Sequence, residues 1–267
     1  MRLIIENDYE SMSEWAARYV GRAIRAHRPT SSDPFVLGLP TGSTPIGIYR
    51  HLIKLHQTDG LSFKHVVTFN MDEYIGLAED HPQSYHRFME EHFFKHIDIP
   101  KENIHIPNGN APDIIQECYE YEKTIASFGG VDLFLGGIGS DGHIAFNEPF
   151  SSFDSQTRVK RLTIDTRAAN SRFFNDDINK VPELAVTVGI KTIMDAQQIV
   201  ILVNGYGKTR ALQAMIEGPM TQMWPCSILQ SHSNCLVVCD EEAANELKVS
   251  TYKYFKKVEA GTPEASD

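Results

Sequence analysis

Short apolar segments recur along the chain and alternate with amphipathic stretches. Each segment is rich in branched or aromatic side chains and ends at or near glycine, asparagine or aspartate. Their apolarity is continuous rather than alternating, which is typical of strands that are covered on both faces of a parallel sheet. The pattern predicts strands at residues 35–39, 65–70, 131–138, 184–190, 198–204 and 235–240.

The stretches between these strands have the spacing of amphipathic helices. Within residues 111–130 an apolar stripe repeats every three or four residues and stops at a glycine. We expect further helices at 45–57, 207–218 and 241–258. Strands that alternate with helices indicate right-handed crossovers. The predicted fold is therefore α/β, a three-layer αβα sandwich around a mostly parallel, Rossmann-like sheet.

Composition favours a single globular domain over residues 1–267, with a frayed polar tail at 259–267. The 35 acidic residues outnumber the 25 basic ones, and the net charge of -10 argues against nucleic-acid binding. Four irregularly spaced cysteines suit buried thiols better than disulfides or zinc knuckles. No apolar run approaches the ~20 residues of a membrane helix. We expect a cytoplasmic protein without nucleic-acid or membrane partners.

In an open α/β sheet ligands bind beyond the carboxyl ends of the strands, so the residues after each strand carry the functional prediction. The first such segment is LPTGSTP, residues 39–45. A loop with Gly42, Ser43 and Thr44, followed by Pro45 at a helix start, presents backbone N–H groups to an anion. The same residues also suit an ordinary capped helix, and the loop alone does not separate these interpretations.

Several cations are placed to assist such a loop. Lys208 follows a strand at the start of a predicted helix, although Leu202 stands where a P-loop requires glycine, which excludes a nucleoside triphosphate site. Arg172 lies in the helix-like stretch 166–174, and arginine is a natural partner of phosphate. For the basic run at 158–161 alone, a solvated charged face is the favoured interpretation.

Two segments carry candidate catalytic groups. Asp72 and Glu73 directly follow a strand, and because extended neighbours point in opposite directions only one should face the cleft. Desolvation would raise the pKa of that carboxylate and suit it to take a proton from carbon next to a carbonyl. A helix cap or salt bridge is the competing explanation for this pair.

The glycine-rich stretch 136–149 contains Asp141, His143 and Glu148. A histidine between two carboxylates can be held in one orientation and can relay a proton between oxygens. A metal site is disfavoured because neither a third histidine nor HExxH spacing is present. These residues together predict an enzyme that acts on a small sugar phosphate.

Six blocks of the sequence, which together cover nearly the whole chain, resemble the glucosamine-6-phosphate deaminase family. The resemblance implies conversion of glucosamine 6-phosphate and water to fructose 6-phosphate and ammonia in amino-sugar catabolism, without metal or organic cofactor. The blocks are LPTGSTP, TFNMDEYIGL, HPQSYHRFM, GGIGSDGHIAFNEP, TRAANSRFF and ELKVSTYKYF.

The resemblance also implies roles for particular residues. His143 would open the sugar ring with the help of Asp141 and Glu148, and Asp72 would then move the C2 proton. The residues implied to bind the phosphate are Gly42, Ser43, Thr44, Arg172 and Lys208.

Members of the family are typically homohexamers, and some are activated by N-acetylglucosamine 6-phosphate at a subunit interface. Residues similar to that regulatory site are Ser151, Arg158, Lys160 and Tyr254, and we assign Arg161 to the same candidate site. The chain departs from the bacterial pattern at Gln156, at Arg161 and in TQMW at 221–224, which bears on regulation and subunit contacts. A sugar-phosphate lactonase or isomerase on the same scaffold, and a catalytically silent sensor, are the alternatives.

Overall fold

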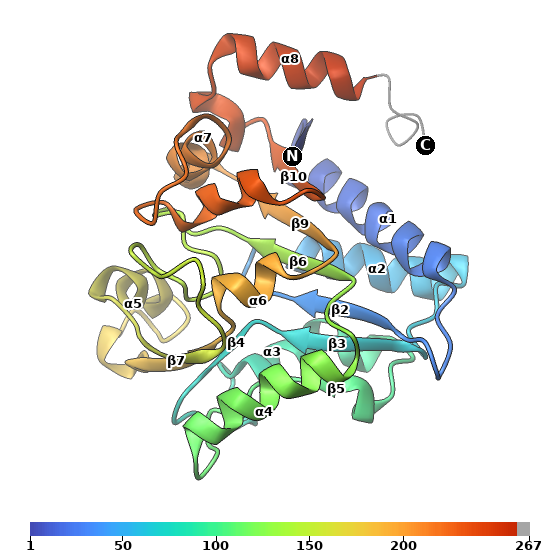
Figure 1. The fold of residues 1–267 in the computed structure, drawn as a ribbon, viewed down its shortest axis with the longest axis vertical. Helices are drawn as coiled ribbons and strands as arrows, with labels where there is room; N and C mark the ends of the chain where they lie inside the picture. The colour runs from blue at the N-terminus through green and yellow to red at the C-terminus, as the bar shows by residue number, and fades with distance from the viewer. Residues whose placement is uncertain (261–267) are drawn as a thin grey trace.

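The computed structural model describes residues 1–260, and its centre is a twisted parallel sheet of seven strands (Figure 1). Every pair of neighbouring strands in it is parallel. The predicted α/β fold with a mostly parallel sheet is confirmed. In spatial order the strands are β1 (Arg2–Glu6), β10 (Cys235–Asp240), β9 (Gln198–Val203), β6 (Leu133–Gly137), β2 (Phe35–Leu39), β3 (Val66–Asn70) and β5 (Ile104–His105).

Helices cover both faces of this sheet, because successive apolar side chains of each strand point to opposite sides. In β2, Leu37 belongs to one buried cluster and Val36 to the other. The Leu37 cluster lies under α1 (Tyr9–His27), α2 (Ile46–Asp59) and α3 (Tyr85–His92). The Val36 cluster lies under α4 (Ile114–Ser127), α6 (Ile190–Met194), α7 (Thr209–Glu217) and the start of the C-terminal region that ends in α8 (Val249–Glu259).

A second, antiparallel sheet stands beside the carboxyl edge of the first. It has the order β4 (Asp72–Tyr74), β8 (Leu184–Thr187) and β7 (Arg158–Arg161). The helix α5 (Ile164–Ser171) follows β7. The strand predicted at 184–190 exists in part, but its place in a parallel sheet was wrong. Ala185 packs in a separate cluster that includes Tyr74 and Phe146, whereas Val188 packs in the Val36 cluster, so burial alone did not reveal the partners of this strand.

Other boundaries also differ from the prediction. The helix expected at 241–258 is broken, because only η6 (Ala243–Glu246) and α8 are helical. Glu259 closes α8 and is buried, so it is not part of a frayed tail, and the rest of the predicted tail from 261 to 267 lies outside the described residues. The elements β1, α1, β4, β5, α3 and β7 were not predicted. The remaining short 3₁₀ helices are η1 (Phe94–His96), η2 (Lys101–Asn103), η3 (Ile178–Lys180), η4 (Tyr206–Lys208) and η5 (Pro225–Ser231).

The strand order creates one crevice suited to a ligand. The chain runs outward from β2 through β3 to β5 and then returns to place β6 on the other side of β2. Loops that follow β2 and β6 therefore diverge at this point, where open α/β sheets bind their ligands. No helix within residues 1–260 has the length and apolarity needed to cross a membrane.

Candidate active site

The loop after β2 has the geometry expected of an anion site. Gly42 has φ +100°, and a Cβ at this position would meet no atom within 4 Å, so its surroundings are open. The helix α2 begins after Pro45 without a side-chain cap, unlike the ordinary capped start. The Tyr9 hydroxyl lies 3.0 Å from the carbonyl oxygen of Thr44 and accepts the N–H of Gly47 at 2.8 Å. Tyr9 thus connects the loop to the first turn of α2 through hydrogen bonds.

A hydrogen bond joins this loop to the one after β9. The Thr44 hydroxyl donates to Oδ1 of Asn204 at 2.7 Å, four residues before Lys208. Lys208 precedes α7, and burial lowers the pKa of its ammonium. The positive charge of Arg172 lowers this pKa further, whereas the negative charge of Asp141 raises it. The three charged side chains are thus close enough to influence one another. Sequence reasoning missed Asn204, which has no motif of its own.

Arg172 does not lie within a helix as expected. It follows the last residue of α5 as its C-cap. Its guanidinium is exposed and stands 4.6 Å from the centre of the Phe173 ring. Its charge contributes to the lowered pKa of Lys208, so it approaches that ammonium from the end of α5 rather than from a strand end.

Asp72 and Glu73 have opposite surroundings, as expected of neighbours in an extended strand. Asp72 is 7% exposed, and no hydrogen bond from the described residues ends on its carboxylate. Burial, with a smaller contribution from the charge of Glu73, raises the pKa of Asp72 to about 8. Glu73 accepts backbone hydrogen bonds at the start of α3 and so takes the capping role. Asp72 is the one available to a ligand.

The loop after β6 places His143 against a carboxylate. Nδ1 of His143 lies 2.7 Å from Oδ1 of Asp141. Burial raises the pKa of Asp141, but its hydrogen bond and charge interaction with His143 outweigh this effect, so the pKa is lowered. The His143 ring lies directly over Gly139, where an added Cβ would come within 2.5 Å of three ring atoms. Glycine is required there by the close approach of the ring.

Glu148 is not a second hydrogen-bonding partner of His143. It is 3% exposed, and its Oε1 accepts the hydroxyls of Thr163 and Thr166 at 2.9 Å and 2.6 Å, and also the Thr163 N–H. These threonines lie at the start of α5. No hydrogen bond in residues 1–260 joins Glu148 to His143, so the expected arrangement of a histidine between two carboxylates is only half present.

Strand pairing and side-chain hydrogen bonds connect the His143 loop to the strand that carries Asp72. Asp72 pairs with Thr187 across β4 and β8, and the Thr187 hydroxyl accepts the N–H of Phe146 at 3.1 Å. The side chain of Asn147 donates to the carbonyl oxygen of Val188 at 2.8 Å. The two predicted catalytic segments are therefore joined through β8, which sequence reasoning did not assign to the site.

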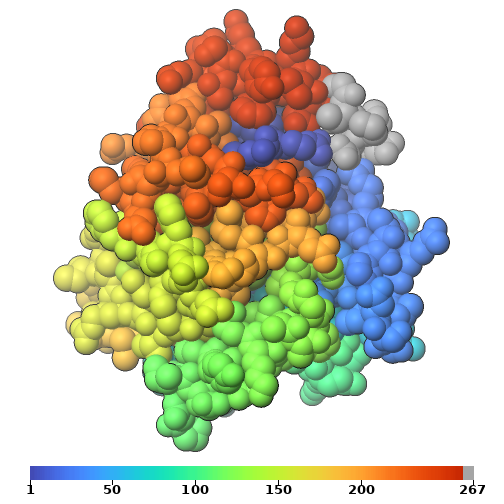
Figure 2. Space-filling view, viewed as in Figure 1, coloured from blue at the N-terminus to red at the C-terminus, as the bar shows by residue number. Residues whose placement is uncertain are grey.

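The predicted regulatory residues are dispersed. Arg158 and Lys160 lie on β7, Arg161 pairs with Glu183 at 3.0 Å, and Tyr254 is 61% exposed on α8. Figure 1 shows α8 at one end of the molecule and β7 on its flank, and Figure 2 shows the orange segment between them. A single chain does not bring Tyr254 to β7. Ser151 is 4% exposed, and its hydroxyl has no hydrogen-bond partner in the described residues.

A cavity of about 840 Å³ lies between α4, the start of β7 and α6. Of the predicted site residues only Arg158 lines it, together with Gln156 and Glu122. The cavity is thus separate from the carboxyl edge of the sheet. Across residues 1–260 no group of three or more histidine, cysteine, aspartate or glutamate side chains is arranged to hold a metal ion.

Comparison with known proteins identifies the family to which this architecture belongs. The family model described as glucosamine-6-phosphate isomerases/6-phosphogluconolactonase matches residues 7–238. The glucosamine-6-phosphate deaminase of Phocaeicola vulgatus is 60% identical over 259 residues, which cover 97% of this chain and 98% of that protein.

Two solved structures show different degrees of likeness. A monomeric glucosamine-6-phosphate deaminase has 44% identity and a TM-score of 0.88, covering 92% of this chain and 99% of its own. A 6-phosphogluconolactonase from Trypanosoma cruzi has 21% identity and a TM-score of 0.72, covering 92% and 97%, and shares the fold alone. The chain belongs to the glucosamine-6-phosphate isomerase and 6-phosphogluconolactonase family.

Proposed function

We propose that this protein is a glucosamine-6-phosphate deaminase, which converts glucosamine 6-phosphate and water to fructose 6-phosphate and ammonia. The observation that carries the proposal is the buried carboxylate of Asp72, which accepts no hydrogen bond from residues 1–260. Its strand is joined through β8 to the loop of Asp141 and His143. The 60% identity to a deaminase over nearly the full length supports it, whereas the likeness to a lactonase concerns only the fold. The sugar-phosphate lactonase is therefore the weaker candidate.

His143 would act first, on the closed sugar ring. Its imidazole takes the proton of the C1 hydroxyl and delivers one to the ring oxygen, so that the ring opens to an aldehyde. Asp141, 2.7 Å from Nδ1, holds the ring orientation and stabilises the protonated form. Glu148 would act only indirectly, because its carboxylate is engaged by the two threonines before and in α5.

Asp72 would act next, on carbon. A carboxylate that receives no hydrogen bond from residues 1–260 and whose pKa is about 8 is a stronger base than an exposed aspartate, and its ionised fraction grows as the pH approaches 8. It takes the proton from C2 and an enol-type intermediate forms. Return of a proton to C1 leaves a C2 imine, which water converts to the ketone as ammonia departs.

The phosphate would lie in the loop of Gly42, Ser43 and Thr44, near Lys208 and Arg172. The open space over Gly42 and the uncapped start of α2 support this placement. Two charge-assisted hydrogen bonds of ~1.5–3 kcal/mol each give binding in the millimolar-to-micromolar range once a helix-terminus contribution of ~1 kcal/mol is added. Such affinity suits a metabolic enzyme.

We also propose that the chain forms homohexamers and that N-acetylglucosamine 6-phosphate activates it. The support is the separation of Tyr254 from Arg158 and Lys160 within one chain, since a neighbouring copy would have to complete such a site. The unpartnered hydroxyl of Ser151 is a further group that a ligand could engage. The free thiols of all four cysteines fit a reducing, cytoplasmic location.

The decisive experiment measures fructose 6-phosphate release from glucosamine 6-phosphate by the native protein and by Asp72→Asn. We expect turnover by the native protein and a loss of at least about 100-fold in the variant, since asparagine cannot take a proton. Absence of native turnover, with or without N-acetylglucosamine 6-phosphate, would redirect the assignment to a lactone or ketose substrate. Equal activity of both proteins would remove Asp72 from its role.

A further inference from the structure

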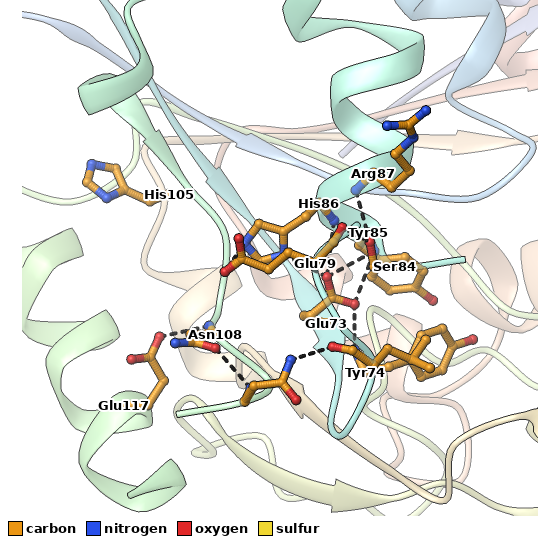
Figure 3. Close-up of polar contacts among 12 residues, drawn as sticks. Glu73, Tyr74, Glu79, Ser84, Tyr85, His86, Arg87, His105, Asn108 and Glu117 are labelled. Atoms are coloured by element: carbon orange, nitrogen blue, oxygen red, sulfur yellow. Dashed lines mark hydrogen bonds and ion pairs between the residues drawn. The ribbon is translucent and has the colours of Figure 1, made fainter. Parts of the chain in front are cut away.

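Glu73 is a buried carboxylate that the proposed reaction does not use. It is 2% exposed and lies next to Asp72 in β4. Its two oxygens accept the backbone N–H of Tyr74 at 2.8 Å, of Tyr85 at 2.9 Å and of His86 at 3.1 Å. Figure 3 shows Glu73 reaching from the strand to the N-terminus of α3. Donors from two elements therefore converge on one side chain.

His86 completes the set of donors. Its Nδ1 lies 2.8 Å from Oε2 of Glu73, while its Nε2 lies 3.9 Å from the exposed carboxylate of Glu79. A carboxylate only accepts hydrogen bonds, so four surrounding donors match its ionised form. The start of a helix also favours a negative charge. The surroundings of Glu73 therefore supply the donors that an ionised carboxylate requires.

The contacts of Glu73 reach the reacting groups from two sides. On its own strand it adjoins Asp72. Through α3 it fixes Tyr85, whose ring packs against Tyr74 at 4.9 Å and against Phe146 at 6.3 Å between centres. Phe146 belongs to the loop that carries His143. One buried carboxylate therefore connects the strand of the proposed carbon base with the helix that supports the His143 loop.

We propose that Glu73, held by His86 and the first N–H groups of α3, is a positioning residue for Asp72 and places a permanent negative charge beside it. The inference rests on the proposed role of Asp72 as the base that takes the C2 proton. Glu73 itself touches no substrate in this arrangement. Its carboxylate acts by holding β4 in place and by opposing ionisation of its neighbour.

The electrostatic part of this role follows from the surroundings of Asp72. Burial is the main reason that its pKa is raised, and the charge of Glu73 is the second. The phenols whose pKa values the charge of Asp72 helps to raise come from three other elements and from its own strand, and because those pKa values are raised they do not replace Glu73 as a source of charge. They are Tyr49 from α2, Tyr85 from α3 and Tyr121 from α4, with Tyr74 on the same strand.

The test compares the pH dependence of kcat/KM for the native protein and Glu73→Gln. Asp72 must be ionised to take a proton, so activity falls as the pH drops below its pKa. Removal of the neighbouring negative charge lowers that pKa. We therefore expect the acid limb, the part of the pH profile in which kcat/KM falls with falling pH, to move to lower pH by about one unit. Titrating groups of the substrate are common to both profiles. A purely structural defect would lower the plateau without moving the limb.

Glu79→Gln is the matched control. It makes the same chemical change beside the same histidine, but its carboxylate is 64% exposed. We expect its kcat/KM and acid limb to match those of the native protein. A shift as large as that of Glu73→Gln would overturn the inference, because it would show that a distant surface charge has the same effect.

Variants of His86 keep the inference testable if Glu73→Gln fails to fold. Asparagine retains a donor near the position of Nδ1 and leucine does not. We expect His86→Leu to lower kcat about tenfold with little change in KM, as loss of a hydrogen bond to a charged group implies, and His86→Asn to restore most of it. Equal kcat in the native protein and His86→Leu would contradict the positioning role.

The outcomes also separate this inference from the proposed function. If Asp72→Asn is inactive and the acid limb of Glu73→Gln does not move, the inference alone is wrong. If Asp72→Asn keeps full activity, Asp72 is not the base, and the inference fails together with that role.

Discussion

The residues proposed for catalysis and those proposed for regulation are organised differently in this protein. Asp72, His143 and Lys208 follow three strands of one parallel sheet and lie at its carboxyl edge. Within one chain, hydrogen bonds join the Lys208 loop to the loop of Gly42, and the His143 loop to β8, which pairs with the strand of Asp72. Arg158 and Tyr254, in contrast, lie on β7 and on α8, far from each other. The comparison teaches that one chain brings the proposed catalytic residues to the same edge, while the proposed regulatory residues would need a second copy of the chain to meet.

The physical reason is the direction of the strands. Parallel strands deliver all their following loops to one edge, so residues distant in sequence converge there. The strand β7 is an edge strand of a small antiparallel sheet, and α8 is the last helix of the described chain, so their side chains face outward. Three predictions test the two halves of this contrast, beginning with the largest expected effect.

The first prediction concerns the stability of the catalytic edge. The pKa of Asp72 is raised from 3.8 to about 8, so the native state holds a proton that the unfolded chain releases. The contribution of this group to stability is therefore lost as the pH rises from about 4 to about 8. Asp72→Asn should be more stable than the native protein above that range, by roughly 3–5 kcal/mol.

Urea unfolding of both proteins at several pH values measures this difference. The difference in the free energy of unfolding between the two proteins should be small near pH 4 and should grow until about pH 8, as the linkage relation requires. A difference that does not depend on pH would mean that burial does not disfavour the ionised form of Asp72, which would contradict the prediction.

The second prediction concerns the packing of His143. A Cβ at position 139 would collide with its ring, so Gly139→Ala should displace the imidazole from Asp141. We expect kcat to fall about 100-fold, as for loss of a general acid–base group, while Lys208 and the anion loop keep KM within about threefold. Steady-state kinetics measures both parameters. The outcome that contradicts it is a change of KM alone.

Gly137→Ala is the control for that substitution. It lies at the end of the same strand, and the only atom near its added Cβ is the carbonyl oxygen of Leu202 at 3.5 Å, an ordinary contact. Its kcat should stay within about threefold of the native value.

The third prediction concerns the regulatory residues and has the smallest effect on basal turnover. Arg158→Met and Tyr254→Ala should each leave kcat without activator within about twofold, because neither lies at the catalytic edge. Each should lose the response to N-acetylglucosamine 6-phosphate. If a site takes Arg158 from one copy and Tyr254 from another, oligomers reassembled from both variants should recover activation at about a quarter of their interfaces.

The size of the native particle, measured by light scattering, accompanies that experiment. A monomer would contradict the proposed hexamer and the shared site together. Activation that survives in both single variants would place the regulatory site elsewhere.

The sequence by itself determined the α/β class, because continuous apolar runs report burial on both faces of a sheet. It also singled out the segments around Gly42, Asp72, His143 and Lys208, because loops that follow buried strands have few other reasons to carry such residues. The resemblance to the deaminase family was equally readable from short motifs. Local patterns suffice for features that neighbouring residues decide.

Only the tertiary structure decided which carboxylates meet which partners. The sequence pairs Glu148 with His143 by proximity, yet the folded chain gives Glu148 to Thr163 and Thr166. It predicts that only one of Asp72 and Glu73 faces the cleft, and the folded chain shows that α3 engages Glu73 and leaves Asp72 without a donor among the described residues. The partners of a side chain depend on contacts between elements far apart in the chain, and no local periodicity encodes them.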